Sequence, residues 1–154
     1  EKDCTCGYGV VDRYLQRISG PLLDRIDLHI EVVPVPFREL NTQQMAENSR
    51  SIRERVMNAR RIQSLRYIDE PGLHCNSLLS SKHLRRYCRI DDAGQQLMKA
   101  AMERLDLSAR AYDRILKVAR TIADLDESVD IRNEHLAEAI NYRSMDRANW
   151  GKSV

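Results

Sequence analysis

Arg110 lies at a position near the start of a predicted helix where a cation is favourable only if an anion binds beside it. It is about the second residue of a helix that we predict to begin after Ser108, in the stretch LSARAYDRILK. A cation there lies at the positive end of the helix dipole, which is unfavourable unless an anion binds beside it. The amide groups of the first turn have no partner within the helix and can bind that anion. Arg114 and Lys117 follow on the same face. This face therefore predicts a contact with a phosphate or with a carboxylate of the fold itself.

Arg25 raises the same question where a short helical stretch ends and an alternating run begins, in LLDRID. Asp24 and Asp27 flank it, so a structural ion pair is the simplest interpretation. The functional alternative is a guanidinium held at a surface and directed at a phosphate of a neighbouring molecule. Arginine suits that role, because its planar fork stays charged and binds two phosphate oxygens at once.

The rest of the chain offers no complete catalytic set. Gly151-Lys152-Ser153 resembles the end of a phosphate-binding loop, but Asp146 stands where that motif requires its first glycine. The four histidines are scattered, without the spacing of metal ligands. Cys4 and Cys6 are separated by one residue, whereas zinc ligands usually have two to four residues between them. We therefore expect no activity in the chain by itself and no metal, with Cys4 and Cys6 at most the remnant of a zinc site.

Composition places these residues in a globular domain. The chain has 154 residues, of which 42% are hydrophobic, enough for one domain with a core or for two smaller pieces. Its 25 basic and 23 acidic residues nearly cancel, so only local arginine clusters could bind nucleic acid. No apolar run approaches the length of a membrane span, and no signal-peptide pattern is present. We expect a cytoplasmic protein without a membrane partner.

The elements that would position Arg25 are short. Residues 13–26 predict a helical stretch that is broken or started at Ser19-Gly20-Pro21. Residues 27–33 alternate with a period of two, which predicts a half-buried strand that ends at the following prolines. One strand alone is not stable, so this strand needs a sheet from elsewhere. Its core face would consist of Leu28, Ile30 and Val32.

A long helix is predicted to begin after Asn41-Thr42. One stripe of this helix, with residues recurring at intervals of three and four, consists of Met45, Ser49, Ile52, Val56, Ala59 and Gln63. The other faces are rich in arginine, and a solvated face is the ordinary interpretation of such a pattern. A face that binds DNA or a protein partner is the alternative. Its candidate residues are Arg50, Arg53, Arg60 and Arg61.

A small helical bundle would carry Arg110. We predict helices over 78–88, 91–105, 108–126 (with Ser108 as its cap) and 133–145. Apolar stripes on the last three would meet in the core. They consist of Leu97, Met98, Ala101 and Leu105, of Tyr112, Ile115, Leu116, Ala119, Ile122 and Ala123, and of Leu136, Ala139 and Ile140.

Three stretches resemble the C-terminal third of the magnesium-chelatase-like AAA+ ATPases of bacteria, in the competence-associated group thought to act in DNA branch migration. They are RISGPLLDRIDLHIEV, LSARAYDRILKVARTIADL and HLAEAINYR, in the family's order. The resemblance runs from about Cys4 to Arg147 and implies a mostly α fold, the C-terminal part of an AAA+ module. One residual core β-strand would precede a long helix and a helical lid. The division would be a core remnant at 1–40, a connecting helix at 41–72, a lid at 73–147 and a tail at 148–154.

The resemblance also implies roles for the two arginines. Arg25 matches the arginine finger that such a motor supplies in trans to a neighbouring subunit's ATP. Arg110 matches the sensor-2 arginine, which the lid supplies in cis, with Arg114 as a weaker contact. Both would stabilise charge on the γ-phosphate during its transfer. The Walker motifs would lie upstream, so we expect ATP and Mg²⁺ only in an intact protein, a homo-hexamer acting on DNA.

Two other functions remain open. Magnesium chelatase motor subunits, which insert a metal ion into a porphyrin, resemble this chain in architecture and share both arginines. The Cys4-Thr5-Cys6 segment and the amino-acid sequence of the predicted 108–126 helix favour the competence-associated group. The last alternative is a non-enzymatic helical module that binds DNA or a protein partner through the arginine-rich face at 50–66.

Overall fold

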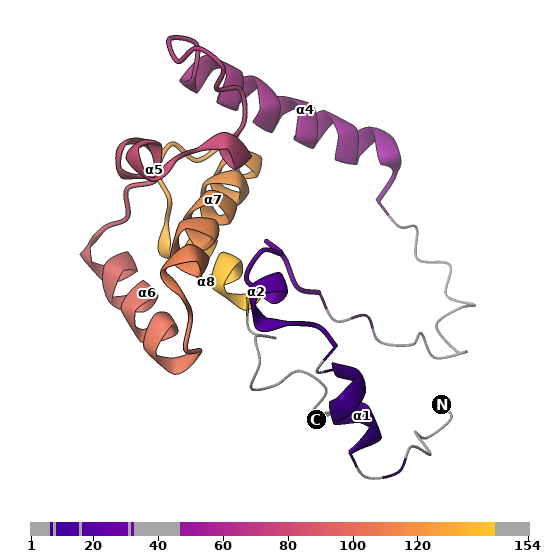
Figure 1. Ribbon diagram of the computed structural model, residues 1–154. Coiled ribbons are helices and arrows are strands. Elements are labelled where there is room, and N and C mark those ends of the chain that lie inside the picture. Colours follow the sequence, from indigo (N-terminus) through magenta and orange to yellow (C-terminus); the bar gives the residue numbers. More distant parts are fainter. Residues whose placement is uncertain (1–6, 8, 16, 31, 33–46, 144–154) are drawn as a thin grey trace.

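The structure is a computed structural model that describes residues 7, 9–15, 17–30, 32 and 47–143. Its described part consists of helices and connecting loops (Figure 1), which confirms the mostly helical fold predicted from the sequence. The elements are α1 (Val10–Leu15), α2 (Gly20–Leu23), α4 (Ser49–Arg66), the 3₁₀ turn η1 (Asn76–Leu78), α5 (Ser81–Tyr87), α6 (Asp92–Arg104), α7 (Ala109–Leu125) and α8 (Asn133–Asn141).

Polar caps explain where two helices of the bundle begin. The Ser108 hydroxyl accepts a hydrogen bond from the backbone N–H of Ala111 at 3.2 Å. The Asp91 carboxylate accepts one from Gly94 at 2.7 Å. Each cap satisfies an amide group that has no partner within the first helical turn. Helices α7 and α6 therefore begin where the sequence predicts, and both end within a residue of the predicted position.

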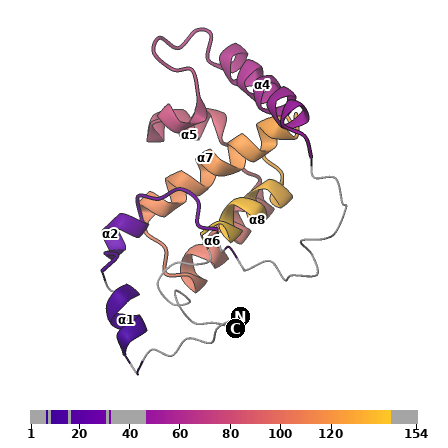
Figure 2. The same cartoon turned by 90° about the vertical axis from the view of Figure 1, so that its right-hand side faces the viewer.

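Helix α7 lies in the middle of the bundle and packs against α8, α5, η1 and α4 (Figure 1, Figure 2). Most of its predicted apolar stripe is buried, and Ile115 and Ala119 are fully inaccessible. Tyr112 is an exception, because Ala111 takes the core-facing position and leaves Tyr112 36% exposed. The predicted stripes of α6 and α8 contribute further buried side chains, namely Met98, Ala101, Leu136, Ala139 and Ile140.

Residues 27–30 and 32 form no strand, so the strand predicted over 27–33 is wrong for these residues. Residues 31 and 33 lie outside the described part. Leu28, Ile30 and Val32 are exposed by 45%, 67% and 87%, respectively. The physical reason is that the described part of the chain contains no neighbouring strand to complete a hydrogen-bonded ladder. The backbone N–H of His29 donates instead to the carbonyl of Tyr142 at 2.8 Å, next to the end of α8.

Helix α4 begins at Ser49, later than predicted, because Asn48 caps it by accepting a hydrogen bond from the Ser51 amide at 2.9 Å. The predicted start, residues 41–46, lies outside the described part. Ala59 and Gln63 of its stripe are buried, whereas Ile52 and Val56 are 42% and 39% exposed. The helix lies across the C-terminal end of α7, and its N-terminal half projects beyond the bundle (Figure 1, Figure 2).

Two of the remaining helices are shorter than predicted. The region predicted as a helix over 78–88 contains the end of η1 and then α5, and α8 ends at Asn141 rather than at 145. None of the described helices is both long enough and apolar enough to span a membrane.

Candidate functional site

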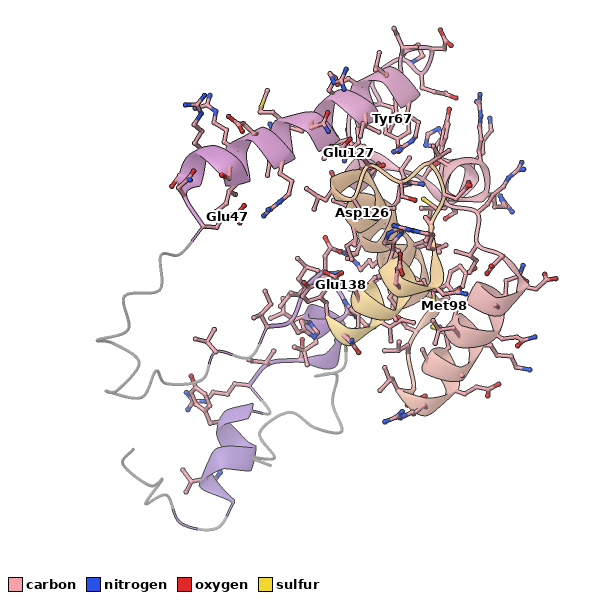
Figure 3. All side chains as sticks on the ribbon, turned by 180° about the vertical axis from the view of Figure 1, so that it is seen from behind. Glu47, Tyr67, Met98, Asp126, Glu127 and Glu138 are labelled. Atoms are coloured by element: carbon pink, nitrogen blue, oxygen red, sulfur yellow. The ribbon has the colours of Figure 1, made fainter. Side chains whose placement is uncertain are left out.

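A cavity of about 600 Å³ lies between α7, α8 and the segment that follows α2. Its cationic lining residues are Arg110, Arg114 and Lys117, so the structure brings together the three cations that the sequence places on one face. Glu138 of α8, labelled in Figure 3, lines the same cavity. The apolar part of the wall consists of Leu28, Ile30, Val118, Ile122 and Leu125.

Two of the three cations are engaged by the fold. Arg114 forms an ion pair and a hydrogen bond with Asp27. Lys117 donates from Nζ to the carbonyl of Ser77 at 3.0 Å. Arg110 is exposed and forms no ion pair with a residue in the described part of the chain. The sequence left open whether this face contacts a phosphate or a carboxylate of the fold, and for Arg114 the contact is a carboxylate, that of Asp27. The role of Arg114 as a phosphate contact stays a prediction.

Arg25 lies just after α2 and is exposed. Its flanking carboxylates have other partners: an oxygen of Asp24 lies 3.8 Å from a guanidinium nitrogen of Arg143, and Asp27 pairs with Arg114. The structural ion pair that is the simplest interpretation of the sequence is therefore not formed within the described residues. The guanidinium of Arg25 is left at the surface.

Arg143 is a residue of this region that sequence reasoning missed. Its side chain is 1% exposed, and its guanidinium donates to the backbone carbonyl of Ile26 as well as lying close to Asp24. It thereby attaches the segment around Arg25 to the end of α8. The available signal was its position directly after the apolar stripe of a helix, at the end of HLAEAINYR.

A buried polar network joins α4, η1 and α7 around Asp124, whose side chain is fully inaccessible. Arg66 donates to both carboxylate oxygens, one at 2.9 Å. Arg120 Nε and Asn76 Nδ2 donate to the same carboxylate at 3.1 and 2.8 Å. Tyr67, at the end of α4 nearest the bundle in Figure 3, donates to Asn76 at 2.6 Å.

Burial and charge oppose each other in this network. Burial disfavours the charge of Arg66, but the hydrogen bonds and negative charge of Asp124 outweigh it and raise the pKa of Arg66. For Arg120 burial prevails and lowers the pKa. Burial also raises the pKa of Tyr67 and keeps its hydroxyl protonated. The network therefore stabilises the junction between α4 and α7.

Cys88 is a buried thiol rather than a reactive one. Burial raises its pKa to about 12, so the thiolate that would attack an electrophile or bind a metal is absent at neutral pH. Cys4 and Cys6, the suggested remnant of a zinc site, lie outside the described residues.

Asp126, Glu134 and His135 place their side-chain ligand atoms within 4.8 Å of one another, at the end of α7 labelled by Asp126 in Figure 3. His135 Nδ1 accepts the backbone N–H of Arg132 at 3.1 Å, and its Nε2 lies 3.3 Å from both an oxygen of Asp126 and a guanidinium nitrogen of Arg132. The Arg132 guanidinium already pairs with both carboxylates. These contacts form the cap at the start of α8 and account for the closeness of the three side chains.

The candidate nucleic-acid residues share the exposed face of α4. Arg50 pairs with Glu54 at 3.0 Å, and Arg61 donates to Asn58 at 3.1 Å. Arg53 and Arg60 form no ion pair with a described residue and are exposed. Of the six arginines of the helix, Arg50, Arg55 and Arg66 pair with described carboxylates, so the positive charge of this face rests mainly on Arg53, Arg60 and Arg61.

Both parts of the chain match known family models. Residues 46–143 match the model described as "Magnesium chelatase, subunit ChlI C-terminal". Residues 1–40 match the model described as "Magnesium chelatase, subunit ChlI". The two matches include the segment of Arg25 and the whole helical bundle.

Similar proteins extend well beyond this chain. The "Competence protein ComM" of Haemophilus influenzae is 46% identical over 136 residues, which are 88% of this chain and 26% of that protein. YifB of Escherichia coli is 41% identical over 136 residues, which are 88% of this chain and 26% of that protein. YifB of Salmonella typhimurium is 38% identical over 137 residues, 88% of this chain and 26% of that protein. The chain therefore spans about a quarter of the length of these relatives.

Proposed function

Because this chain belongs to the magnesium-chelatase-like AAA+ family, we propose that it supplies two arginines to the ATP site of a longer motor protein. The phosphate-binding loop and the Mg²⁺ ligands would lie in the part of that protein outside this chain. ATP with Mg²⁺ would bind there, and the residues described here would act on its phosphates from outside the loop.

Arg25 is proposed as the arginine finger, which reaches the ATP of a neighbouring subunit. The observation that carries this proposal is the exposed guanidinium of Arg25, whose two flanking carboxylates are engaged by other arginines. A finger must not be neutralised by its own chain, because its charge has to act on the γ-phosphate as negative charge redistributes during transfer.

Arg110 is proposed as the sensor-2 arginine of the lid. It lies in the first turn of α7, where unpaired amide groups and the helix dipole favour a bound phosphate. It is exposed and faces the cavity beside the Arg25 segment. Carboxylates also line this cavity, but none of the described ones forms an ion pair with Arg110, which leaves its guanidinium available to a triphosphate.

DNA is proposed as the substrate of the motor, which would form a ring of six subunits. The name of the H. influenzae relative, a competence protein, favours DNA. The positive face of α4 provides a surface for phosphates, with Arg50, Arg53, Arg60 and Arg61 as its contacts. The second candidate is metal insertion into a porphyrin, which the name of the matching family models favours.

The ATPase proposal is tested in the longer protein with Arg25→Ala and Arg110→Ala. We expect Arg25→Ala to lower the rate of ATP hydrolysis about a thousandfold, because a finger contributes at least that factor, while nucleotide binding is retained. Arg89→Ala, an exposed arginine that does not line the cavity, is the matched control and should hydrolyse ATP normally. Normal turnover by the Arg25→Ala protein would refute the finger.

The substrate is tested with the same protein by comparing stimulation of ATP hydrolysis by branched DNA and by a porphyrin. Arg53→Glu with Arg60→Glu should weaken DNA binding and reduce its salt dependence, whereas Arg104→Glu should not. Stimulation by porphyrin alone would favour the chelatase function. Salt-sensitive DNA binding without any hydrolysis by the intact protein would favour a binding module.

A further inference from the structure

The segment that contains Arg25 is held against the lid by contacts on both sides. On one side, Asp27 pairs with Arg114 of α7. On the other, Arg143 donates to the carbonyl of Ile26, and the N–H of His29 donates to the carbonyl of Tyr142 at 2.8 Å. The segment is therefore bound to α7 and to the end of α8 at the same time.

We propose that Asp27 and Arg114 are positioning residues, which orient the Arg25 segment relative to α7. This inference rests on the proposed function, in which Arg25 and Arg110 act on ATP. Asp27 follows Arg25 by two residues, and Arg114 follows Arg110 by about one turn of α7. One ion pair thus connects the two stretches of chain that carry the proposed ATP-contacting arginines.

The surroundings of Arg114 make Asp27 its specific partner. The Arg114 side chain is 25% exposed, and its Nε is buried without a hydrogen-bond partner in the described part of the chain. Asp113 and Glu138 also line the cavity, but they accept hydrogen bonds from Ser81 and Tyr142. Loss of Asp27 would leave a half-buried guanidinium with no carboxylate of its own, so the side chain would have to turn elsewhere.

The pair also sets the charge around Arg110. Asp27 neutralises one of the three cations on this face, and removing its charge makes the neighbourhood of Arg110 more positive. A more positive site attracts ATP at least as strongly as before. The Arg25 segment, however, keeps only its attachment to α8 and loses its orientation relative to α7. Turnover should therefore fall without any weakening of ATP binding, which general loss of structure would not produce.

The test uses the longer, ATP-hydrolysing protein with Asp27→Asn, Arg114→Gln and the exchanged pair Asp27→Arg with Arg114→Asp. We expect Asp27→Asn to lower kcat for ATP hydrolysis about tenfold while KM for ATP stays the same or falls. The exchanged pair restores the attraction with reversed charges and should recover kcat above that of either single variant. Asp27→Glu, which keeps the carboxylate, should stay close to the unchanged protein.

A second ion pair of the lid serves as the control. Arg86 and Glu70 lie 2.6 Å apart and join α5 to the loop after α4, away from the cavity. Glu70→Gln and Arg86→Gln should leave kcat and KM unchanged. A normal kcat in Asp27→Asn, in a protein that Arg25→Ala inactivates, would overturn the positioning role while the finger survives. Failure of the exchanged pair to exceed the single variants would overturn it as well. Normal turnover by Arg25→Ala would instead remove the proposed function itself.

Discussion

Asp124 is the central residue of the junction between α4, η1 and α7. Its carboxylate is fully buried and accepts hydrogen bonds from Arg66, Arg120 and Asn76, which come from three different elements. The two arginines could not be buried without it, because an unpaired charge in the interior is very unfavourable. Burial and the Asp124 carboxylate act in opposite directions on the two arginines. Burial is the larger effect at Arg120 and lowers its pKa, whereas the carboxylate is the larger effect at Arg66 and raises its pKa.

Asp124→Asn should therefore lower the free energy of unfolding by about 3–5 kcal/mol, the typical effect of removing one member of a buried ion pair. Urea unfolding followed by circular dichroism measures it. Asp69→Asn is the matched control, because Asp69 is exposed and its substitution should change stability by less than about 0.5 kcal/mol. Equal losses in the two variants would contradict the assigned role of Asp124.

At the scale of the element, α7 links the core to the candidate site. One face packs in the centre of the bundle, another lines the cavity with Arg110 and Arg114, and its C-terminal end carries Asp124. The position of Arg110 depends on where the first turn begins, and the Ser108 cap sets that start. By contrast, the alternating run after α2 has no neighbouring strand in the described structure, and its described residues form no strand.

Ser108→Ala should lower the free energy of unfolding by about 1 kcal/mol, because the amide of Ala111 loses its acceptor. Thermal or urea denaturation of the chain gives this value. Ser64→Ala, at an exposed position inside α4, is the control and should stabilise slightly, since alanine favours a helix interior. If Ser108→Ala were as stable as the unchanged chain, the cap would not define the start of α7.

At the scale of the whole molecule, the N-terminal segment and the bundle are held together by few contacts. Arg143, almost fully buried, reaches the carbonyl of Ile26, and Arg114 reaches Asp27. Most described hydrophobic side chains of this segment remain exposed, with Leu23 as a buried exception, so its attachment to the bundle depends largely on polar contacts. Such a segment should open locally well before the bundle unfolds.

Arg143→Met keeps the length of the side chain and removes its hydrogen bonds and charge. Hydrogen exchange measured by mass spectrometry should become at least tenfold faster in residues 17–30, because the Ile26 carbonyl and Asp24 lose their donor. Residues 109–125 should remain protected. Arg89→Met, at an exposed position, is the control. Faster exchange of the two regions to the same extent would show a general loss of stability rather than a local attachment.

The sequence by itself predicted most of the elements and much of the core. The period of the apolar residues and the caps at Ser108 and Asp91 are local signals, so they predict α6 and α7 without knowledge of the fold. The same holds for Ile115, Ala119 and Leu136, which lie on the predicted stripes and are buried. The resemblance that pointed to the magnesium-chelatase-like family also lies in continuous stretches of sequence, and the family matches confirm it.

Only the tertiary structure decided which charged residues form ion pairs with one another. Asp27 pairs with Arg114, 87 residues away, and not with its neighbour Arg25. Arg66 and Asp124 are 58 residues apart, and Arg143 reaches Ile26 across 117 residues. The strength of an ion pair depends on distance in space and on burial, and neither quantity is present in a sequence pattern. For the same reason, alternation could mark an apolar face at residues 27–33, but only a neighbouring strand could have made it part of a sheet.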